Sequence, residues 1–372
     1  MENRTKNIIY NVTPCIHTLI IFFSRHLAGS DETMECDSVA PPTYLSYISM
    51  IASLLLSMIT IPGNVLVLLA VYKDPYKELR QPFTVLIANL ALADLTAGSI
   101  TDPMAVFFMV KEVRGGHVQG FTVYLTHLSY FISCTTSVLT LGLLAVDRYL
   151  AISQGLWYKS HINLVSTMKI CAFVWVISIA LSMAYIKTGF IHFAFVFANT
   201  AVLSTACVLA VSYYRIFKSL RIRTRQVGVL HEGTSQQSQR QNAAAILETK
   251  LTKLYMLMLG VFLLCFVPSC SFIYVMYLCT TCNCVAIHWL RDMSFLLVLT
   301  NSSLNPILYS LKMKKFRKAF MLIINCRREQ EREENLTEQG GLSNGNLQSE
   351  QTRETVVSKE TVAMHVARQR ET

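Results

Sequence analysis

The sequence predicts an all-α membrane protein: a bundle of seven transmembrane helices, with a short amphipathic eighth helix on the inner membrane face. Of its 372 residues, 52% are hydrophobic and only 15% are charged, whereas soluble domains carry roughly 25% charged residues. The apolar residues form seven long runs, and a spanning helix needs about 20 of them. The links between runs are alternately basic and poor in charge, which is typical of cytoplasmic and outer loops.

Each apolar run is long enough to cross a bilayer. In order they are Tyr44–Tyr72, Pro82–Val110, Phe121–Ile152, Met168–Ile186, Phe190–Ile216, Leu251–Leu278 and Val285–Leu311. The fourth and fifth must be separate, because Met168–Ile216 is far too long for one crossing. The predicted parts are an extracellular N-terminal segment (1–43), a seven-transmembrane domain (44–311), an amphipathic membrane-surface helix (312–326) and a disordered cytoplasmic tail (327–372), which is rich in Glu, Gln, Asn and Ser.

Basic residues follow the first, third, fifth and seventh runs, as in Lys312–Lys318 after the last. The positive-inside rule therefore predicts a multi-pass protein of the cell membrane with its N-terminus outside and its C-terminus inside. Topology also accounts for the formal charge of +10, so a nucleic-acid partner is not predicted. Cys326 follows the surface helix, and it is either palmitoylated or a free cytosolic thiol.

The predicted outer segments carry candidates for covalent modification. Asn3 and Asn11 begin Asn-X-Thr tripeptides, the N-glycosylation pattern. The disulfide candidates are Cys15, Cys36, Cys279, Cys282 and Cys284. We expect one bond within the 279–284 loop and a second from this loop to Cys36 or Cys15.

Ionisable groups inside spanning helices are costly and are therefore functional candidates. Asp94 lies in the middle of the second run, and Asn301, Ser302 and Asn305 share one face of the seventh. A carboxylate surrounded by neutral oxygens can hold a small cation such as sodium. The alternative is a hydrated hydrogen-bond cluster that only joins helices, and residue chemistry alone does not separate the two.

A second polar group lies at the predicted inner surface. Asp147, Arg148 and Tyr149 end the third run, and Glu248 precedes the sixth. An Arg148–Glu248 pair would link the inner ends of these helices, whereas the alternative is that both side chains extend to water. Pro268 and Pro306 interrupt the sixth and seventh runs, where proline kinks a helix. A kink beside aromatic residues is a plausible lever for moving the inner end.

Taken together, these features resemble the rhodopsin-like (class A) G-protein-coupled receptors over Tyr44–Cys326. Every run carries one mark of that class, in the right order. The marks are Gly63-Asn64-Val65, Leu90 with Asp94, Asp147-Arg148-Tyr149, Trp175, Tyr213, Phe262 with Cys265 and Pro268, and Asn305-Pro306-Ile307-Leu308-Tyr309, followed by Phe316. The resemblance implies a receptor that binds an extracellular ligand and activates a heterotrimeric G protein by outward movement of the sixth helix.

The resemblance also assigns roles. A sodium pocket would comprise Asp94, Ser137, Asn301 and Asn305, the ion being allosteric and no other cofactor being expected. Arg148 would hold Glu248 at rest and engage the G protein when active, and Leu156 would contact the G protein. The activation switch would comprise Asp147, Arg148, Tyr149, Tyr213, Glu248, Phe262, Phe266, Pro268, Pro306 and Tyr309. Arrestin and receptor kinases would act through the C-terminal tail.

Departures from the class pattern bear on the ligand. Val123 stands where most members carry a bridging cysteine, and Thr205 replaces the usual proline of the fifth helix. These departures are nearest in pattern to the melanocortin, lysolipid, cannabinoid and adenosine receptors. Amine receptors carry an aspartate eighteen positions before Arg148, where this chain has Tyr130, and opsins carry a lysine six positions before Asn305, where it has Leu299.

The expected ligand pocket is mostly apolar, which favours a lipid-like ligand, a neutral small molecule or a peptide. Its predicted residues are Asp102, Tyr130, Phe131, Cys134, Phe266, Ser269, Ile273, Phe295 and Leu299. The competing interpretation is a transporter or channel that uses Asp94 as an ion or proton site. Transporters often contain internal repeats, and none is evident. No arrangement of catalytic residues is evident either, so an enzyme is not predicted.

Overall fold

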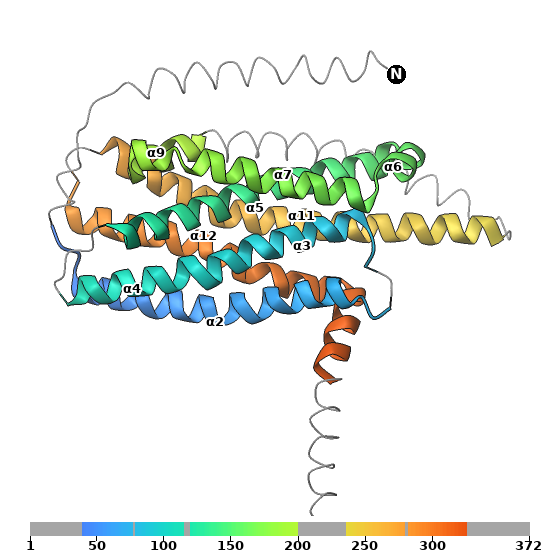
Figure 1. Cartoon of the computed structure of the whole chain (residues 1–372), viewed down its shortest axis with the longest axis horizontal. Helices are drawn as coiled ribbons and strands as arrows, with labels where there is room; N and C mark the ends of the chain where they lie inside the picture. Colours follow the sequence, from blue (N-terminus) through green and yellow to red (C-terminus); the bar gives the residue numbers. More distant parts are fainter. Residues whose placement is uncertain (1–38, 77–78, 115–119, 200–235, 280–281, 326–372) are drawn as a thin grey trace, which may run out of the picture. The chain divides into compact units, whose positions relative to one another are not determined.

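The computed structural model of the protein describes residues 39–76, 79–114, 120–199, 236–279 and 282–325, which form helices and connecting turns without a strand. The helices are α2 (Thr43–Lys73), α3 (Pro82–Thr96), the π-helix η2 (Ala97–Thr101), α4 (Asp102–Val113), α5 (Phe121–Ser153), α6 (Gly155–His161), α7 (Leu164–Ser182), α8 (Tyr185–Thr188), α9 (Phe190–Phe197), α11 (Gln236–Leu278), α12 (Cys284–Lys312) and a helix over 314–325. Two compact units, Met1–Arg317 and Lys318–Thr372, divide the chain. In the first, the long helices lie side by side with their links at the two ends (Figure 1).

Among the described residues, five helices are long and apolar enough to cross a membrane. They are Thr43–Lys73, Pro82–Val113, Phe121–Ala151, Leu164–Thr188 and Lys250–Leu278, and they match the first, second, third, fourth and sixth predicted spans. α9 begins the fifth, of which the part from residue 200 onward lies outside the described residues. α12 covers the seventh, and it carries Arg291, Asp292 and several Asn and Ser residues.

Local sequence explains where several helices begin and end. The side-chain oxygens of Asn163 and Asn283 accept hydrogen bonds from the backbone N–H groups of Ser166 and Val285, which caps α7 and α12. Between α8 and α9 the chain turns at Gly189, whose φ of 76° suits a residue without Cβ. The predicted break between the fourth and fifth spans is thus present as a turn.

The second span is less regular than the sequence indicates. η2 interrupts it directly before Asp102 and Pro103, and proline has no N–H with which to continue the α-helical bonding. The hydroxyl of Ser57 donates to the Gly98 carbonyl at 2.9 Å, and the hydroxyls of Thr101 and Ser129 lie 2.9 Å apart. Neighbouring helices therefore satisfy polar groups that the irregular turn exposes.

Each long helix packs against one or more of the others. α11 packs along α12, α2 against α4 and α12, and α5 against α3 and α7. Two glycines lie where another helix comes close: Gly63 on α2 faces α12, and Gly98 on η2 faces α2. A Cβ added at Gly63 would lie 2.9 Å from Cβ of Pro306, and one added at Gly98 would lie 2.9 Å from Cγ2 of Thr60. Side-chain volume at these two positions therefore limits how closely the helices approach.

Candidate functional site

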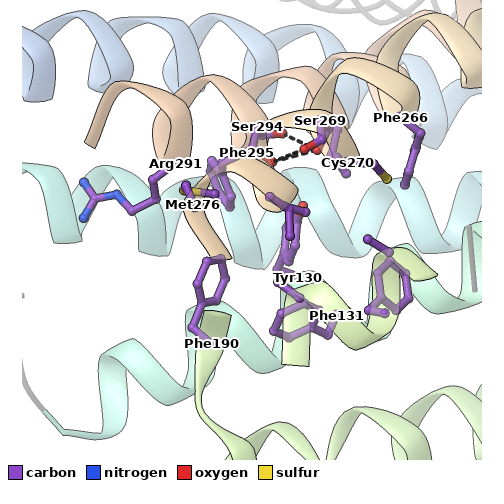
Figure 2. A pocket seen from close by; sticks show the side chains of 15 residues that line it. Tyr130, Phe131, Phe190, Phe266, Ser269, Cys270, Met276, Arg291, Ser294 and Phe295 are labelled. Atoms are coloured by element: carbon purple, nitrogen blue, oxygen red, sulfur yellow. Dashed lines mark hydrogen bonds between the residues drawn. The ribbon is translucent and has the colours of Figure 1, made fainter. Parts of the chain in front are cut away.

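A cavity opens between α5, α9, α11 and α12, with an empty volume of about 450 Å³ that includes open solvent at its mouth. Aromatic and aliphatic side chains form most of its wall (Figure 2). The lining residues are Tyr130, Phe131, Phe190, Ala194, Phe197, Ala198, Phe266, Ser269, Cys270, Ile273, Met276, Arg291, Ser294, Phe295 and Val298. An apolar wall with few polar groups is typical of a small-molecule site.

Ring contacts hold this wall in place. The Tyr130 ring lies 5.3 Å from Phe295 across the α5–α12 boundary, and Phe131 meets Phe193 edge-on at 4.6 Å. Phe266 stacks on Phe262 with ring centroids 4.2 Å apart. Because Phe262 and Phe266 precede Pro268 on α11, a ligand in this cavity contacts the helix beside its proline.

Two serines form the polar part of the wall between α11 and α12, and we call them the serine pair. The hydroxyls of Ser269 and Ser294 lie 2.7 Å apart, and Ser269 Oγ also lies 3.2 Å from the Ser294 carbonyl oxygen. Figure 2 shows the two side chains facing each other across the helix boundary. Both are buried, so their hydrogen bond is shielded from competition with water.

A smaller, more polar cavity lies next to the first and shares Tyr130, Phe266 and Val298 with it. The residues that line it are Ala97, Tyr130, Ser133, Cys134, Ser137, Phe266, Val298, Leu299, Asn301 and Ser302. The three shared side chains therefore separate an apolar cavity from a region rich in hydroxyl and amide groups.

Asp94 is fully buried near this second cavity, one helical turn from Ala97. Its Oδ2 accepts a hydrogen bond from Nδ2 of Asn305 at 2.8 Å. Within the described part of the chain, Asp94 Oδ1 and Ser137 Oγ are buried without a hydrogen-bond partner. Two oxygens of this kind suit a hard cation or an ordered water molecule.

At one end of the bundle, charged residues link three helices. Arg291 on α12 bonds to Asp292 through Nε at 2.9 Å and to Glu112 on α4 through Nη2 at 3.3 Å. The hydroxyls of Ser46 and Ser49 on α2 donate to Glu112 and Asp292 at 3.0 and 2.8 Å. We call these five residues the rim network. It fixes this end of α12 against α2 and α4.

At the other end of α5, Arg148 is buried with only 2% of its surface exposed. Its Nε and Nη2 donate to Oδ2 of Asp147 at 2.9 and 2.6 Å, and the Tyr158 hydroxyl donates to Oδ1 of Asp147 at 2.6 Å. The guanidinium also lies over the Phe83 ring at 4.3 Å. The carboxylate therefore holds Arg148 while Tyr158, on α6, holds the carboxylate.

A cluster of rings joins α5 to the turn between α8 and α9, and we call it the ring cluster. His127 Nδ1 lies 2.7 Å from the Tyr185 hydroxyl, and its ring lies 4.4 Å from Phe190. Phe131 packs against both Tyr185 and Phe190. Val123, where most rhodopsin-like receptors carry a bridging cysteine, lies one turn before His127, so noncovalent contacts attach the α8–α9 turn to α5.

The structure separates the predicted pocket residues into three groups. Tyr130, Phe131, Phe266, Ser269, Ile273 and Phe295 line the first cavity, while Cys134 and Leu299 line the second. Asp102 lines neither of these two cavities; it is buried, and its Oδ1 has no hydrogen-bond partner among the described residues. The η2 turn directly precedes Asp102. A π-helical turn changes the direction in which the following side chains point, and the prediction assumed a regular α-helix.

Several lining residues were not predicted. Phe190, Ala194, Phe197 and Ala198 belong to the start of the fifth span, and Met276, Arg291, Ser294 and Val298 lie on α11 or α12. The spacing of Arg291, Ser294, Phe295 and Val298 places them on one helical face. Because Phe295 was already a candidate, this spacing could have predicted the other three residues from the sequence.

The switch residues are only partly described. Asp147 and Arg148 are bonded as given above, and the Tyr309 ring lies 5.8 Å from the Phe316 ring. Pro268 and Pro306 lie inside α11 and α12. Tyr213 and the side chains of Leu156 and Glu248 lie outside the described residues, so the Arg148–Glu248 pair stays a prediction.

The α11–α12 link is cross-linked. Cys279 and Cys282 form a disulfide, and Cys284 is disulfide-bonded as well. Cys15, Cys36, Cys326, Asn3 and Asn11 lie outside the described residues. The predicted bond to Cys36 or Cys15, the glycosylation and the palmitoylation therefore stay predictions.

Comparisons with known proteins identify the family. Residues 63–309 match the family of 7 transmembrane receptors (rhodopsin family). The chain is 29% identical to the histamine H2 receptor of Canis lupus familiaris over 320 residues, which cover 80% of this chain and 84% of that receptor. The histamine H2 receptors of Rattus norvegicus and Homo sapiens are 29% and 27% identical over 293 residues, covering 73% of this chain and 78% of each relative.

These relatives leave the finer resemblance to the melanocortin, lysolipid, cannabinoid and adenosine receptors a prediction. The competing interpretation as a transporter or channel finds no support in them. Membership of the family defines a multi-pass protein of the plasma membrane that acts as a receptor and not as an enzyme. The chain belongs to the rhodopsin family of seven-transmembrane G-protein-coupled receptors, which bind an extracellular ligand and couple to a heterotrimeric G protein.

Proposed function

We propose that this receptor responds to a neutral, largely apolar ligand that binds in the cavity between α5, α9, α11 and α12. The carrying observation is the cavity wall: aromatic and aliphatic side chains with no acidic residue among those that line it. A lipid-like molecule, a neutral small molecule or an apolar side chain of a peptide would bury its surface there.

The relatives are named for histamine, and the resemblance gives a reason to propose a different ligand here. Tyr130 occupies the position where amine receptors carry an aspartate, and its ring packs against Phe295. A protonated amine in the cavity would lack a carboxylate partner on the wall. Burying an unpaired charge costs several kcal/mol, and this cost favours a neutral ligand over an amine.

Protection of Cys270 tests the ligand class. This thiol lines the cavity and is only partly buried. In purified receptor in lipid nanodiscs, toluene and benzyl alcohol are expected to slow modification of Cys270 by methyl methanethiosulfonate, mapped by mass spectrometry. Benzylamine and benzoate are expected to leave the rate unchanged. No carboxylate lines the cavity for benzylamine, and the cation for benzoate, Arg291, is already paired with Glu112 and Asp292.

Cys171 is the control thiol, because it lies on α7 and does not line the cavity. Its rate of modification should be the same with every probe. Protection of Cys270 by benzylamine alone would contradict the proposed ligand class. Protection by no probe at all would exclude this cavity as the ligand site.

The cavity and the rim network are proposed to face the outside, with the N-terminus outside and the C-terminus inside. The basic links after alternate spans support this orientation. An epitope tag at Met1 should bind antibody on intact cells, and a tag at Thr372 only after permeabilisation. The reverse staining pattern would place the cavity and the rim network on the cytoplasmic side and contradict the proposed topology.

Asp94, Ser137, Asn301 and Asn305 are proposed to hold an allosteric sodium ion. Support comes from the buried oxygens of Asp94 and Ser137, which have no partner among the described residues. Asp94→Asn should keep the hydrogen-bonding shape and remove the charge, so sodium should lose its effect on basal nucleotide exchange. Potassium in place of sodium is the control, since it should act weakly on the wild type. An unchanged sodium response in Asp94→Asn would leave Asp94 a structural role only.

Activation is proposed to proceed by outward movement of the inner end of α11. Ligand would press on Phe266 and Phe262 beside Pro268, and Arg148 would leave its resting partners, Glu248 among them, to engage the G protein. Tyr213 and Tyr309 would stabilise the active arrangement, and Leu156 would pack against the G protein. Arrestin and receptor kinases are proposed to bind the C-terminal tail.

A further inference from the structure

The polar groups on the cavity wall differ in how far they are already engaged. Four of the lining residues carry a side-chain oxygen or nitrogen: Tyr130, Ser269, Arg291 and Ser294. The Tyr130 ring packs against Phe131 and Phe295. Arg291 is bonded to Glu112 and Asp292, whose two negative charges exceed its own positive charge. The serine pair is uncharged, and its hydrogen bond is the one among these groups that joins α11 to α12.

The serine pair also joins two helices. Its hydroxyls lie 2.7 Å apart, and Ser294 Oγ lies 3.4 Å from the Ser269 carbonyl oxygen. Ser269 directly follows Pro268, where α11 lacks one backbone hydrogen bond. The pair therefore connects α11 to α12 at the point where α11 bends most easily.

α12 is the fixed partner in this connection. Asp292 accepts from Ser49 in a buried hydrogen bond, and Arg291 binds Glu112 on α4. These bonds lie within one turn of Ser294 and attach α12 to α2 and α4. Loss of the serine pair would consequently loosen α11 against α12 and leave α12 attached to α2 and α4.

We infer that the serine pair recognises a hydroxyl or amide group of a neutral ligand, and that this group inserts between the two serines and opens the α11–α12 connection. A hydroxyl both donates and accepts, so it can satisfy each serine when their mutual bond breaks. A hydrocarbon cannot, and it would leave both hydroxyls buried without partners. The inference rests on the proposed function, because it takes this cavity as the ligand site.

Alanine variants test the pair without any ligand. Ser269→Ala and Ser294→Ala should each raise ligand-independent nucleotide exchange about fivefold, the size expected for one net hydrogen bond. The double variant should raise it further, because in each single variant the remaining hydroxyl can still bond to the backbone carbonyl across the helix boundary, at 3.2 or 3.4 Å. Ser271→Ala is the matched control: Ser271 is on the same helix, and its hydroxyl donates to the carbonyl of Val267 in its own helix.

Benzyl alcohol and toluene test the ligand chemistry, since they share a ring and differ by a hydroxyl. With wild-type receptor in nanodiscs and a panel of heterotrimeric G proteins, benzyl alcohol should raise exchange severalfold above toluene. In Ser269→Ala and Ser294→Ala the two probes should act alike. Each receptor is compared at matched amounts of folded protein, and its thermal unfolding midpoint is measured beside the wild type.

The outcomes separate the two proposals. If both probes protect Cys270 and raise exchange equally in the wild type, the serine pair is only structural and the ligand site stands. If neither probe protects Cys270, the proposed ligand site is wrong. The alanine variants then test only whether the serine pair holds the resting state. Wild-type basal exchange in the double variant, or equal effects of Ser271→Ala, would overturn the inference.

Discussion

Asp147→Asn is expected to raise ligand-independent nucleotide exchange by about 10- to 100-fold. The carboxylate accepts two bonds from Arg148 and one from Tyr158 within a buried site, and a hydrogen bond to a charged group contributes about 1.5–3 kcal/mol. An amide keeps the shape but loses the charge that holds the guanidinium. The measurement is exchange on purified G protein without ligand, at matched receptor amounts.

Three further variants complete this experiment. Tyr158→Phe removes only the hydroxyl that orients Asp147, so its increase should be smaller. Glu248→Ala should also raise basal exchange, because the proposed resting pair with Arg148 is lost. Arg148→Ala should instead lower maximal coupling, since the active state loses its own contact. Wild-type basal exchange in Asp147→Asn together with normal signalling in Arg148→Ala would reduce this network to a structural role.

Gly63→Ala is expected to destabilise the receptor by about 1–3 kcal/mol, the usual cost of overpacking. The added Cβ would lie 2.9 Å from Cβ and 3.0 Å from Cγ of Pro306. A proline ring cannot rotate away as a long side chain can, so α2 and α12 would have to separate. The measurements are the thermal unfolding midpoint of the purified receptor and the amount that reaches the cell surface.

Gly260→Ala is the matched control on α11. A Cβ at Gly260 meets nothing within 4 Å, and alanine is the better helix former, so its midpoint should be unchanged or slightly higher. Equal losses in both variants would mean that the Gly63 result reports helix insertion and not the contact with Pro306.

The spans were predictable because a bilayer allows few alternatives. A backbone in hydrocarbon must satisfy its own hydrogen bonds, so long apolar runs become helices. Asp94 and Asn305 were predicted in one site and are joined by a hydrogen bond, since mid-span polar groups seek each other. The η2 turn was missed because a change of hydrogen-bonding pattern within a helix leaves no mark in the hydropathy of the span.

The rim network and the serine pair were not predicted, for a related reason. Glu112 and Arg291 are 179 residues apart and Ser269 and Ser294 are 25 apart. Their contacts depend on the rotation of each helix about its axis. Apolar runs fix the position of a span and not that rotation, because lipid-facing and buried faces are both hydrophobic. The contact of Tyr158 with Asp147 was missed because it depends on the short helix α6, which follows α5 and was not predicted.

The ring cluster gives the two sides of the proposed outer face different chemical sensitivities. The side formed by α5, α8 and α9 is attached through His127, Tyr185 and Phe190, and the Lys187–Phe190 turn contains no cysteine. The side formed by α11 and α12 carries the Cys279–Cys282 bond and the bonded Cys284. A disulfide is broken by reduction, whereas ring packing and a hydrogen bond are not. Under reducing conditions the side formed by α5, α8 and α9 thus keeps its attachment, and the side formed by α11 and α12 loses its covalent cross-links.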